Sequence, residues 1–328
     1  MTYSVNNSNK ILSIQYLRGM AALGVVLYHY SASLPVNPTL KSIFDFGQTG
    51  VHVFFLISGF IIVYSLLKEK YKLNQFFTFL IKRSVRIDPP YYVAVLLSFL
   101  LLWYLSVISP LKESRFPFIP QQFLAHLFYI VPFTKYHFYS GVFWTLCIEF
   151  QFYLLIGLLY FLSENWYYRT LLLVAFCLTS FIHFPNSQYL IFTYAPIFAA
   201  GISLVTLYLS RTWLNAILPL LLLILIGCKF GLPILILLAA TSLVILFFKF
   251  PVKLFSFMGN ISYSLYLIHT LIMEGLLRIE IKLHLEVGNY PFFWLLIEVL
   301  IAISIAFIFY LIVEKPAVAF SKRFQYKN

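Results

Sequence analysis

The chain has 328 residues, of which 62% are hydrophobic and only 10% are charged, and its mean hydropathy is +0.90. Soluble domains are nearer half apolar and a quarter charged, so this composition excludes a soluble enzyme, a disordered chain and a fibrous repeat. It predicts an all-α integral membrane protein. The net charge of +12 is typical of basic cytoplasmic loops in membrane proteins, so no nucleic-acid partner is expected.

A helix needs about 20 apolar residues to cross a bilayer. The run 121–133 is too short to cross and contains Pro120 and Pro132, so an interfacial or re-entrant piece is expected there. The longer apolar runs predict a multi-pass bundle of about ten transmembrane helices in the lipid bilayer. They lie at 11–31, 49–67, 90–109, 141–162, 170–184, 189–209, 213–228, 231–249, 258–277 and 291–313.

The distribution of basic residues predicts the orientation. With the N-terminus inside, most of the 23 Lys and Arg residues fall in inside loops, which predicts that both termini are cytoplasmic. A bacterial plasma (inner) membrane fits this pattern. Residues 1–328 are expected to form a single transmembrane domain with no appended extracytoplasmic domain. Cys147, Cys177 and Cys228 sit alone in apolar runs, which predicts helix packing and no metal site.

Ionisable side chains inside a membrane span are costly and usually functional. The first span carries Arg18 and His29, eleven residues apart. Eleven residues make about three helical turns, so both would lie on one face, about 16 Å apart along the axis. His29 would then lie towards the outer side and Arg18 towards the inner side. The simpler alternatives are that Arg18 reaches the inner interface and that His29 bonds to a backbone carbonyl.

The second span begins with small residues and His52, and continues to Ser58. These are candidates for the wall of a site, although a histidine there is also common at a membrane interface. An inner loop, expected at 82–92, contains Arg83 and Arg86. Two guanidinium groups three residues apart could bind phosphates. The alternative is that these arginines only contribute to the usual positive charge of cytoplasmic loops.

Further polar groups occur in later spans. Trp144 stands at the start of the fourth span, and Glu149 lies about two turns inside the membrane. A carboxylate there needs a partner, and it belongs either to a structural ion pair or to the site itself. In the ninth span Tyr266 and His269 share a face and follow Tyr263, so they form either contacts between helices or the wall of a cavity. Glu314 closes the tenth span, where pairing with cytoplasmic basic residues is expected.

Taken together and in order, these blocks resemble the acyltransferase-3 family of integral-membrane O-acyltransferases. The resemblance covers nearly the whole chain, and one departure is the second proline in Asp88-Pro89-Pro90-Tyr91. The blocks are Tyr16-Leu17-Arg18-Gly19 with His29, Gly50-Val51 to Ser58-Gly59-Phe60, Arg83 to Pro89, Trp144-Thr145-Leu146 to Glu149 and Tyr153, Ile261 to His269, and Glu314-x-Pro316.

The resemblance implies transfer of an acyl group, usually acetyl from acetyl-CoA, to a sugar hydroxyl. Typical acceptors are cell-surface polysaccharide, lipopolysaccharide and lipid-linked saccharide. The family's arginine and histidine motif corresponds to Arg18 and His29, and its arginine pair to Arg83 and Arg86. We expect His29 to act as general base or as a transient acyl carrier, and Arg18 to stabilise negative charge. Glu149 is expected to orient an imidazole or an arginine.

Acyl-CoA, with acetyl-CoA first, and a carbohydrate acceptor are therefore the expected partners, and no metal is expected. A secondary transporter or glycan flippase is the alternative, because it too would carry charges inside about ten spans. The sequence shows no pair of matching halves of the kind that many transporters have. It predicts no oligomeric state.

Overall fold

The structure is a computed structural model, and its regular structure is helical throughout the part that it describes, with no strand there. This confirms the all-α prediction. The described residues are 11–35, 37–108, 116–160, 166–183, 185–285, 288, 290–324 and 326.

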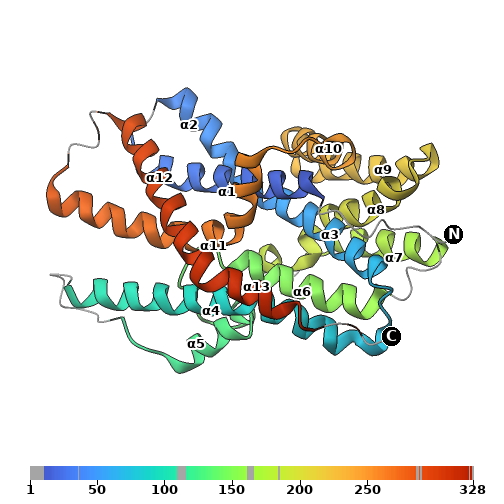
Figure 1. Cartoon of the computed structure of the whole chain (residues 1–328), viewed down its shortest axis with the longest axis horizontal. Helices are drawn as coiled ribbons and strands as arrows, with labels where there is room; N and C mark the ends of the chain where they lie inside the picture. The colour runs from blue at the N-terminus through green and yellow to red at the C-terminus, as the bar shows by residue number, and fades with distance from the viewer. Residues whose placement is uncertain are drawn as a thin grey trace.

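Each predicted apolar run corresponds to a helix (Figure 1). The principal helices are α1 (Leu12–Ala32), α3 (Gly50–Lys68), α4 (Phe76–Ile108), α6 (Trp144–Leu159), α7 (Trp166–Leu178), α8 (Ala195–Ser210), α9 (Trp213–Phe230), α10 (Leu232–Phe247), α11 (Lys253–Leu283) and α12 (Pro291–Phe309). Short helices are α2 (Pro38–Asp45), α5 (Pro120–Leu127) and α13 (Lys315–Ser321). Single turns are η1 (Phe46–Thr49), η2 (Leu73–Gln75), η3 (Val131–Phe133), η5 (Thr179–Phe181), η6 (Ser187–Tyr189), η7 (Ile191–Tyr194) and the π-helical η9 (Tyr310–Glu314).

Among the described residues, five helical segments are long and apolar enough to cross a membrane. They are Pro38–Lys68, Leu73–Val107, Ile191–Ser210, Trp213–Phe230 and Pro291–Ser321, while Trp144–Leu159, Tyr167–Phe181 and Leu232–Phe247 are apolar but shorter. Helices α1 and α11 have 21 and 31 residues but do not reach that apolarity. The membrane character agrees with the prediction, and the count of ten crossings stays a prediction.

The segment 82–92 was wrongly predicted to be a loop. It lies inside α4, a single helix of 33 residues that contains Pro89 and Pro90. Proline has no amide hydrogen, so the helix loses two backbone hydrogen bonds here but does not end. The hydroxyl of Tyr129 donates to the carboxylate of Asp88 beside this break, over 2.8 Å. Arg83 and Arg86 are therefore neighbours on a helical surface.

Loops from different parts of the chain meet at two opposite ends of the bundle. We call the end at which α1 begins end A, and the end at which it finishes end B. At end A the Tyr16 hydroxyl donates to the Phe250 carbonyl over 3.0 Å, in the connection from α10 to α11. At end B the hydroxyls of Ser140 and Thr270 lie 2.8 Å apart. Figure 1 shows end A on the right, where α4 begins and α13 leads to the C-terminus.

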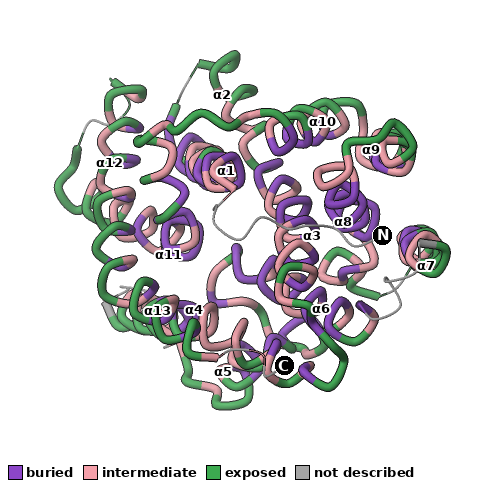
Figure 2. The backbone as a smooth tube through the Cα atoms, turned by 45° about the vertical axis from the view of Figure 1, so that its right-hand side comes forward, coloured by how far each residue is buried: buried purple, intermediate pink, exposed green. Residues whose placement is uncertain are grey.

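Helices α1 and α11 pack side by side (Figure 2). They run in the same direction, because Gly19 meets Met258 near end A and His29 meets His269 further along both helices. Near end A they touch through glycines: a Cβ on Gly19 would lie 2.8 Å from the Met258 Cβ, and one on Gly259 would meet the Gln15 carbonyl. Such small residues let two helix backbones approach closely. Ten residues further along each helix, the side chains of His29 and His269 face each other.

The same kind of contact joins α3 to α8. A Cβ on Gly59 would meet the carbonyl of Phe198, and one on Gly201 would lie 2.9 Å from the Phe60 amide nitrogen. Helix α8 is buried along most of its length, with Ile197 and Val205 fully enclosed. It therefore supports α3 from behind, and α3 turns its other side towards α1 and α6.

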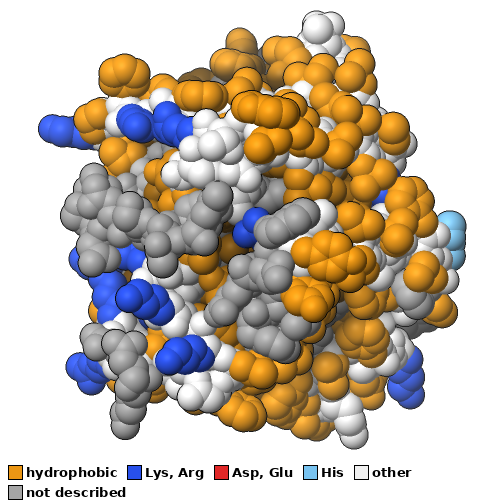
Figure 3. Space-filling view, turned by 90° about the vertical axis from the view of Figure 1, so that its right-hand side faces the viewer, with side chains coloured by type: hydrophobic (Ala, Val, Ile, Leu, Met, Phe, Trp, Pro, Cys, Tyr) orange, Lys and Arg blue, Asp and Glu red, His pale blue; other side chains and the backbone are white. Residues whose placement is uncertain are grey.

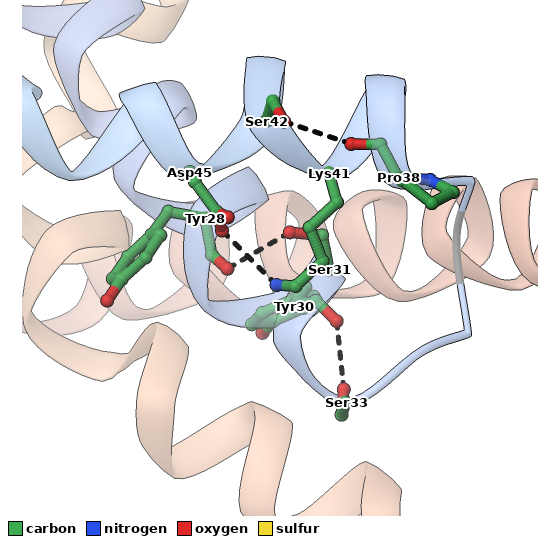
Figure 4. A network of polar contacts seen from close by, with 8 residues as sticks. All are labelled: Tyr28, Tyr30, Ser31, Ser33, Pro38, Lys41, Ser42 and Asp45. Atoms are coloured by element: carbon green, nitrogen blue, oxygen red, sulfur yellow. Dashed lines mark hydrogen bonds and ion pairs between the residues drawn. The ribbon is translucent and has the colours of Figure 1, made fainter.

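The end of α1 at end B is closed by local hydrogen bonds and by α2 (Figure 4). Hydroxyls of the final turn donate to carbonyls of the same helix, and α2 carries an exposed Lys41–Asp45 ion pair of 3.2 Å. The contacts drawn are Ser31 to Tyr28, Ser33 to Tyr30, Ser42 to Pro38, and Lys41 to Asp45. This keeps α1 helical through His29.

We predict that Gly259→Ala destabilises the protein, because the added methyl group would meet the backbone of α1. The expected loss is on the order of 1–3 kcal/mol of unfolding free energy, measured by thermal unfolding in detergent. Gly275→Ala on the same helix is the matched control, because a Cβ there meets no atom within 4 Å. Equal midpoints for the two variants would contradict close packing at Gly259.

Candidate active site

A cavity lies between α1, α3, α4, α6, α11 and η9. The residues that α1, α4 and α11 contribute lie in the first halves of these helices, which all begin at end A, so the cavity is nearer to that end. Side chains of α3 give it an apolar wall that includes Phe54, Phe55 and Ile61. Its charged and polar side chains are Arg18, Ser58, Arg83, Arg86, Thr145, Glu149, Tyr153, Tyr263, Tyr266 and Glu314.

Three guanidinium groups meet in this cavity, those of Arg18, Arg83 and Arg86. Ion pairs within 4.0 Å in the described part of the chain are Lys41–Asp45, Lys82–Glu69 and Arg278–Glu274, none of them at the cavity. Arg18 and Arg86 repel each other, while the carboxylates of Glu149 and Glu314 attract Arg18 from a longer distance. The site thus gathers more positive than negative charge and holds its arginines without a close carboxylate partner there.

Glu149 is occupied by hydroxyl groups. Its carboxylate accepts hydrogen bonds from the Tyr153 hydroxyl at 2.5 Å and from the Ser58 hydroxyl at 3.2 Å. The Ser58 contact joins α3 to α6, and the two contacts together fix where the carboxylate lies.

Glu314 has a different partner from the one predicted. Its carboxylate accepts from both the backbone amide and the hydroxyl of Ser264 on α11, at 3.1 and 2.5 Å. It closes a π-helical turn, a feature that often marks functional sites. Among the described residues Glu314 makes no ion pair within 4.0 Å, although Arg18 and Arg86 attract its carboxylate from a longer distance.

The two tyrosines predicted for the site wall do line the cavity. Tyr263 donates to the Ile87 carbonyl on α4 at 2.9 Å. The Tyr266 hydroxyl lies 2.8 Å from the Thr145 hydroxyl on α6. Both rings are thus held at their distal ends, so the wall that α11 contributes is rigid.

His29 does not line the cavity, although Arg18 on the same helix does. Helix α1 is continuous between them, so three turns separate the two side chains along the axis, as predicted. The Nδ1 atom of His29 lies 2.9 Å from the Val25 carbonyl oxygen and 3.3 Å from Nε2 of His269. His269 lies just beyond Tyr266, with ring centroids 5.9 Å apart. The histidine pair is thus placed past the cavity, towards end B.

Two further predicted wall residues lie beside the cavity instead of in its lining. The ring of His52 packs 5.5 Å from Phe230 and 6.1 Å from Tyr194. Trp144 packs 5.8 Å from Tyr194 and 6.3 Å from Phe55. They belong to an aromatic group that α3, α6, η7 and α9 form around Tyr194.

The sequence analysis named Thr145, Tyr153 and Glu314 within its motif blocks but did not assign these three polar side chains to the site. Tyr153 follows Glu149 by four residues, the spacing of neighbours on a helix, so their contact could have been predicted. Thr145 and Glu314 gave no comparable signal, because their partners are more than 40 residues away in the chain. Within the described residues, no group of three or more His, Cys, Asp or Glu side chains could hold a metal ion.

Comparison with known proteins gives the family. A family model described as an acyltransferase domain matches residues 11–312. The chain belongs to the acyltransferase-3 family. This acyltransferase is 31% identical over 175 residues to "Nodulation protein 10" of Rhizobium leguminosarum bv. viciae, covering 48% of the chain and 47% of that protein. It is 34% identical over 171 residues to "Putative acetyltransferase ORF330" of Acidianus two-tailed virus, covering 52% and 46%.

The match spans about half the length of these curated relatives. No solved structure was found to match the chain. The family model nevertheless covers nearly all of it, so the protein is an acyltransferase enzyme. Arg18, Arg83 and Arg86 together with the histidine pair form its candidate active site.

We predict that Glu314→Gln lowers the unfolding free energy by on the order of 1–3 kcal/mol. Both donors of Ser264 reach the same carboxylate oxygen, and a neutral amide oxygen accepts them less strongly than an ionised carboxylate oxygen does. Thermal unfolding in detergent measures the loss. Glu274→Gln is the control, because it changes a carboxylate in an exposed pair with Arg278. If both variants unfold at the wild-type temperature, the Glu314–Ser264 contact contributes no stability.

Proposed function

We propose that this acyltransferase transfers an acyl group, acetyl first, from acyl-CoA to a sugar hydroxyl of a cell-surface polysaccharide, lipopolysaccharide or lipid-linked saccharide. The carrying observation is the cavity with three guanidinium groups that have no ion-pair partner within 4.0 Å among the described residues. Guanidinium groups bind phosphates with two parallel hydrogen bonds, and coenzyme A carries several phosphates. One relative named as an acetyltransferase supports acetyl as the group transferred.

The donor would enter from end A. Figure 3 views that end and shows several Lys and Arg side chains on it. The loops there carry Lys70, Lys72, Arg211 and Lys249. Basic loops favour the cytoplasmic side, where acyl-CoA is available. We therefore propose that end A and both termini face the cytoplasm, in a bacterial plasma membrane with about ten crossings.

Arg83 and Arg86 are the proposed phosphate ligands, since they lie on one face of α4 near end A. Arg18 lies across the cavity on α1 and would stabilise negative charge on the acyl carbonyl oxygen as it develops. The pantetheine arm is a long flexible chain and would run from the arginines past Tyr266 towards the histidine pair. Glu149 would orient the hydroxyls of Ser58 and Tyr153 along that path.

His29 is the proposed general base. It takes the proton of the acceptor hydroxyl while that oxygen bonds to the thioester carbonyl carbon. The carbon–sulfur bond then breaks and coenzyme A leaves as its thiol, to which the proton returns. The alternative use of the same imidazole is as a transient carrier, in which its nitrogen bonds to the acyl carbon before the sugar oxygen does.

The alternative of a transporter or flippase rested on charges inside about ten spans. Membership of an acyltransferase family accounts for the same arginines and histidines through chemistry, and no observation on the cavity favours transport over transfer.

We predict that Arg83→Gln and Arg86→Gln each raise the KM for acetyl-CoA about 10- to 100-fold, the loss of a charge-assisted hydrogen bond of about 1.5–3 kcal/mol. Release of free thiol by the purified protein in nanodiscs measures this. Arg278→Gln is the matched control, since this exposed arginine pairs with Glu274 away from the cavity. An unchanged KM in both cavity variants would remove the arginines from donor binding.

We also predict that His29→Ala abolishes acyl transfer at unchanged protein abundance. Mass spectrometry of surface glycans from wild-type, deletion and His29→Ala cells would show a base-labile acyl group lost in both mutants. Loss in the deletion alone would retain the enzyme and exclude His29 from the chemistry. Unchanged acylation in all three strains, with altered glycan export in the deletion, would favour the alternative function of a transporter or flippase.

A further inference from the structure

The hydrogen-bond partners of three histidines determine which ring nitrogen carries the proton. The clearest case is His126 on α5. Its Nε2 accepts the Tyr139 backbone amide hydrogen at 3.0 Å, and an amide can only donate. Nε2 must therefore be unprotonated, and Nδ1 carries the hydrogen that it donates to the Gln122 carbonyl at 2.8 Å. Both ring nitrogens are satisfied, so His126 has a structural role.

His269 on α11 has the same arrangement at Nδ1. That atom lies 2.8 Å from the Tyr266 carbonyl oxygen and 3.2 Å from the Leu265 carbonyl oxygen. Carbonyl oxygens only accept, so Nδ1 of His269 carries the hydrogen. Since the ring is fully buried and a buried charge is costly, it is neutral and its Nε2 presents a lone pair.

The partner of that lone pair is His29. Nδ1 of His29 lies 3.3 Å from the His269 Nε2 and 2.9 Å from the Val25 carbonyl oxygen, so it faces two acceptors. It must therefore carry the hydrogen and donate to both. The neutral His29 ring then has its lone pair on Nε2, and that atom makes no hydrogen bond among the described residues.

We propose that His269 is a positioning residue for His29: it accepts the Nδ1 hydrogen of His29 and so leaves Nε2 as the atom that takes the proton or the acyl group. This rests on the proposed role of His29 in transfer. When Nε2 gains a proton, the His29 Nδ1–H bond to the His269 Nε2 strengthens, because a charged donor binds an acceptor more tightly than a neutral one. His269 thus supports the charged intermediate without becoming charged itself.

The surrounding fold holds this pair in place from two sides. The Tyr30 hydroxyl, one residue after His29, donates to the backbone carbonyl of His269 at 2.9 Å. The close contact of α1 with α11 at Gly19 and Gly259 sets the register ten residues earlier. His269 is fully buried and His29 is half-buried, so the His269 ring is fixed while the His29 ring remains accessible to a substrate.

The test compares two substitutions that fill the space differently. His269→Gln keeps a side-chain oxygen that can accept from His29, while His269→Leu fills the buried site with no acceptor. We expect His269→Leu to lower kcat at least about tenfold with the KM for acetyl-CoA unchanged, and His269→Gln to restore most of the loss. If His269 served packing alone, leucine would be tolerated at least as well as glutamine, and that order would overturn the proposal.

A measurement independent of turnover separates this inference from the proposed function. ¹⁵N NMR of histidine-labelled protein in lipid, with the His29 signals identified from their absence in His29→Ala, reports which nitrogen is protonated. We expect His29 to be protonated at Nδ1 and unprotonated at Nε2. Protonation at Nε2 in the neutral ring would overturn the proposal, whether or not the protein transfers acetyl groups.

His126→Gln is the matched control, because it alters a histidine with the same hydrogen-bond pattern outside the site. We expect kcat per folded protein to be unchanged in this variant. If His29→Ala keeps full activity while the NMR result is as expected, the base role fails and the pairing stands. If His126→Gln lowers kcat as much as His269→Leu, a general structural effect replaces the positioning role.

Discussion

The close contact of α1 with α11 is the constraint on which the rest of the site depends. Both helices carry polar groups and are less apolar than their neighbours. Contact with lipid alone would therefore not keep the two helices side by side. Glycines at the contact remove the side chains that would keep the backbones apart. Because the two helices run parallel and in register, one short contact near end A determines which side chains meet three turns further on. The cavity wall and the histidine pair both follow from it.

The second determinant is the cost of charge inside a membrane bundle. An arginine there normally has a carboxylate or carbonyl partner. Here Arg18, Arg83 and Arg86 come together with no ion pair within 4.0 Å in the described part of the chain, and Glu149 is held by hydroxyls. Binding of an anion lowers the free energy of such an arrangement, because the anion pairs with the arginines. The arginines cannot lower it by pairing with one another. This is the physical reason to regard the cavity as a binding site.

The structure separates two groups of polar side chains along one axis. The arginines lie near end A and the histidines lie towards end B, with Tyr266 between them. A soluble acyltransferase can bind donor and acceptor from the same solution. On the proposed function the donor and a surface glycan are on opposite sides of the membrane, so an extended path that holds one substrate at each end suits the chemistry. The rigid tyrosine wall on α11 would keep that path open.

The sequence by itself determined the class of protein, the positions of its helices and the family, because hydropathy and short motifs are local properties. It also placed Arg83 beside Arg86, and Arg18 on one face with His29, since helical spacing is regular. It did not predict that α4 continues through Pro89 and Pro90, because a proline pair usually ends a helix unless tertiary contacts support it. Only the tertiary structure decided that Arg18 belongs with the arginine pair, that Glu314 bonds Ser264, and that His29 meets His269. Those partners lie 50 to 240 residues apart in the chain, and packing between helices, which no local pattern encodes, brings them together.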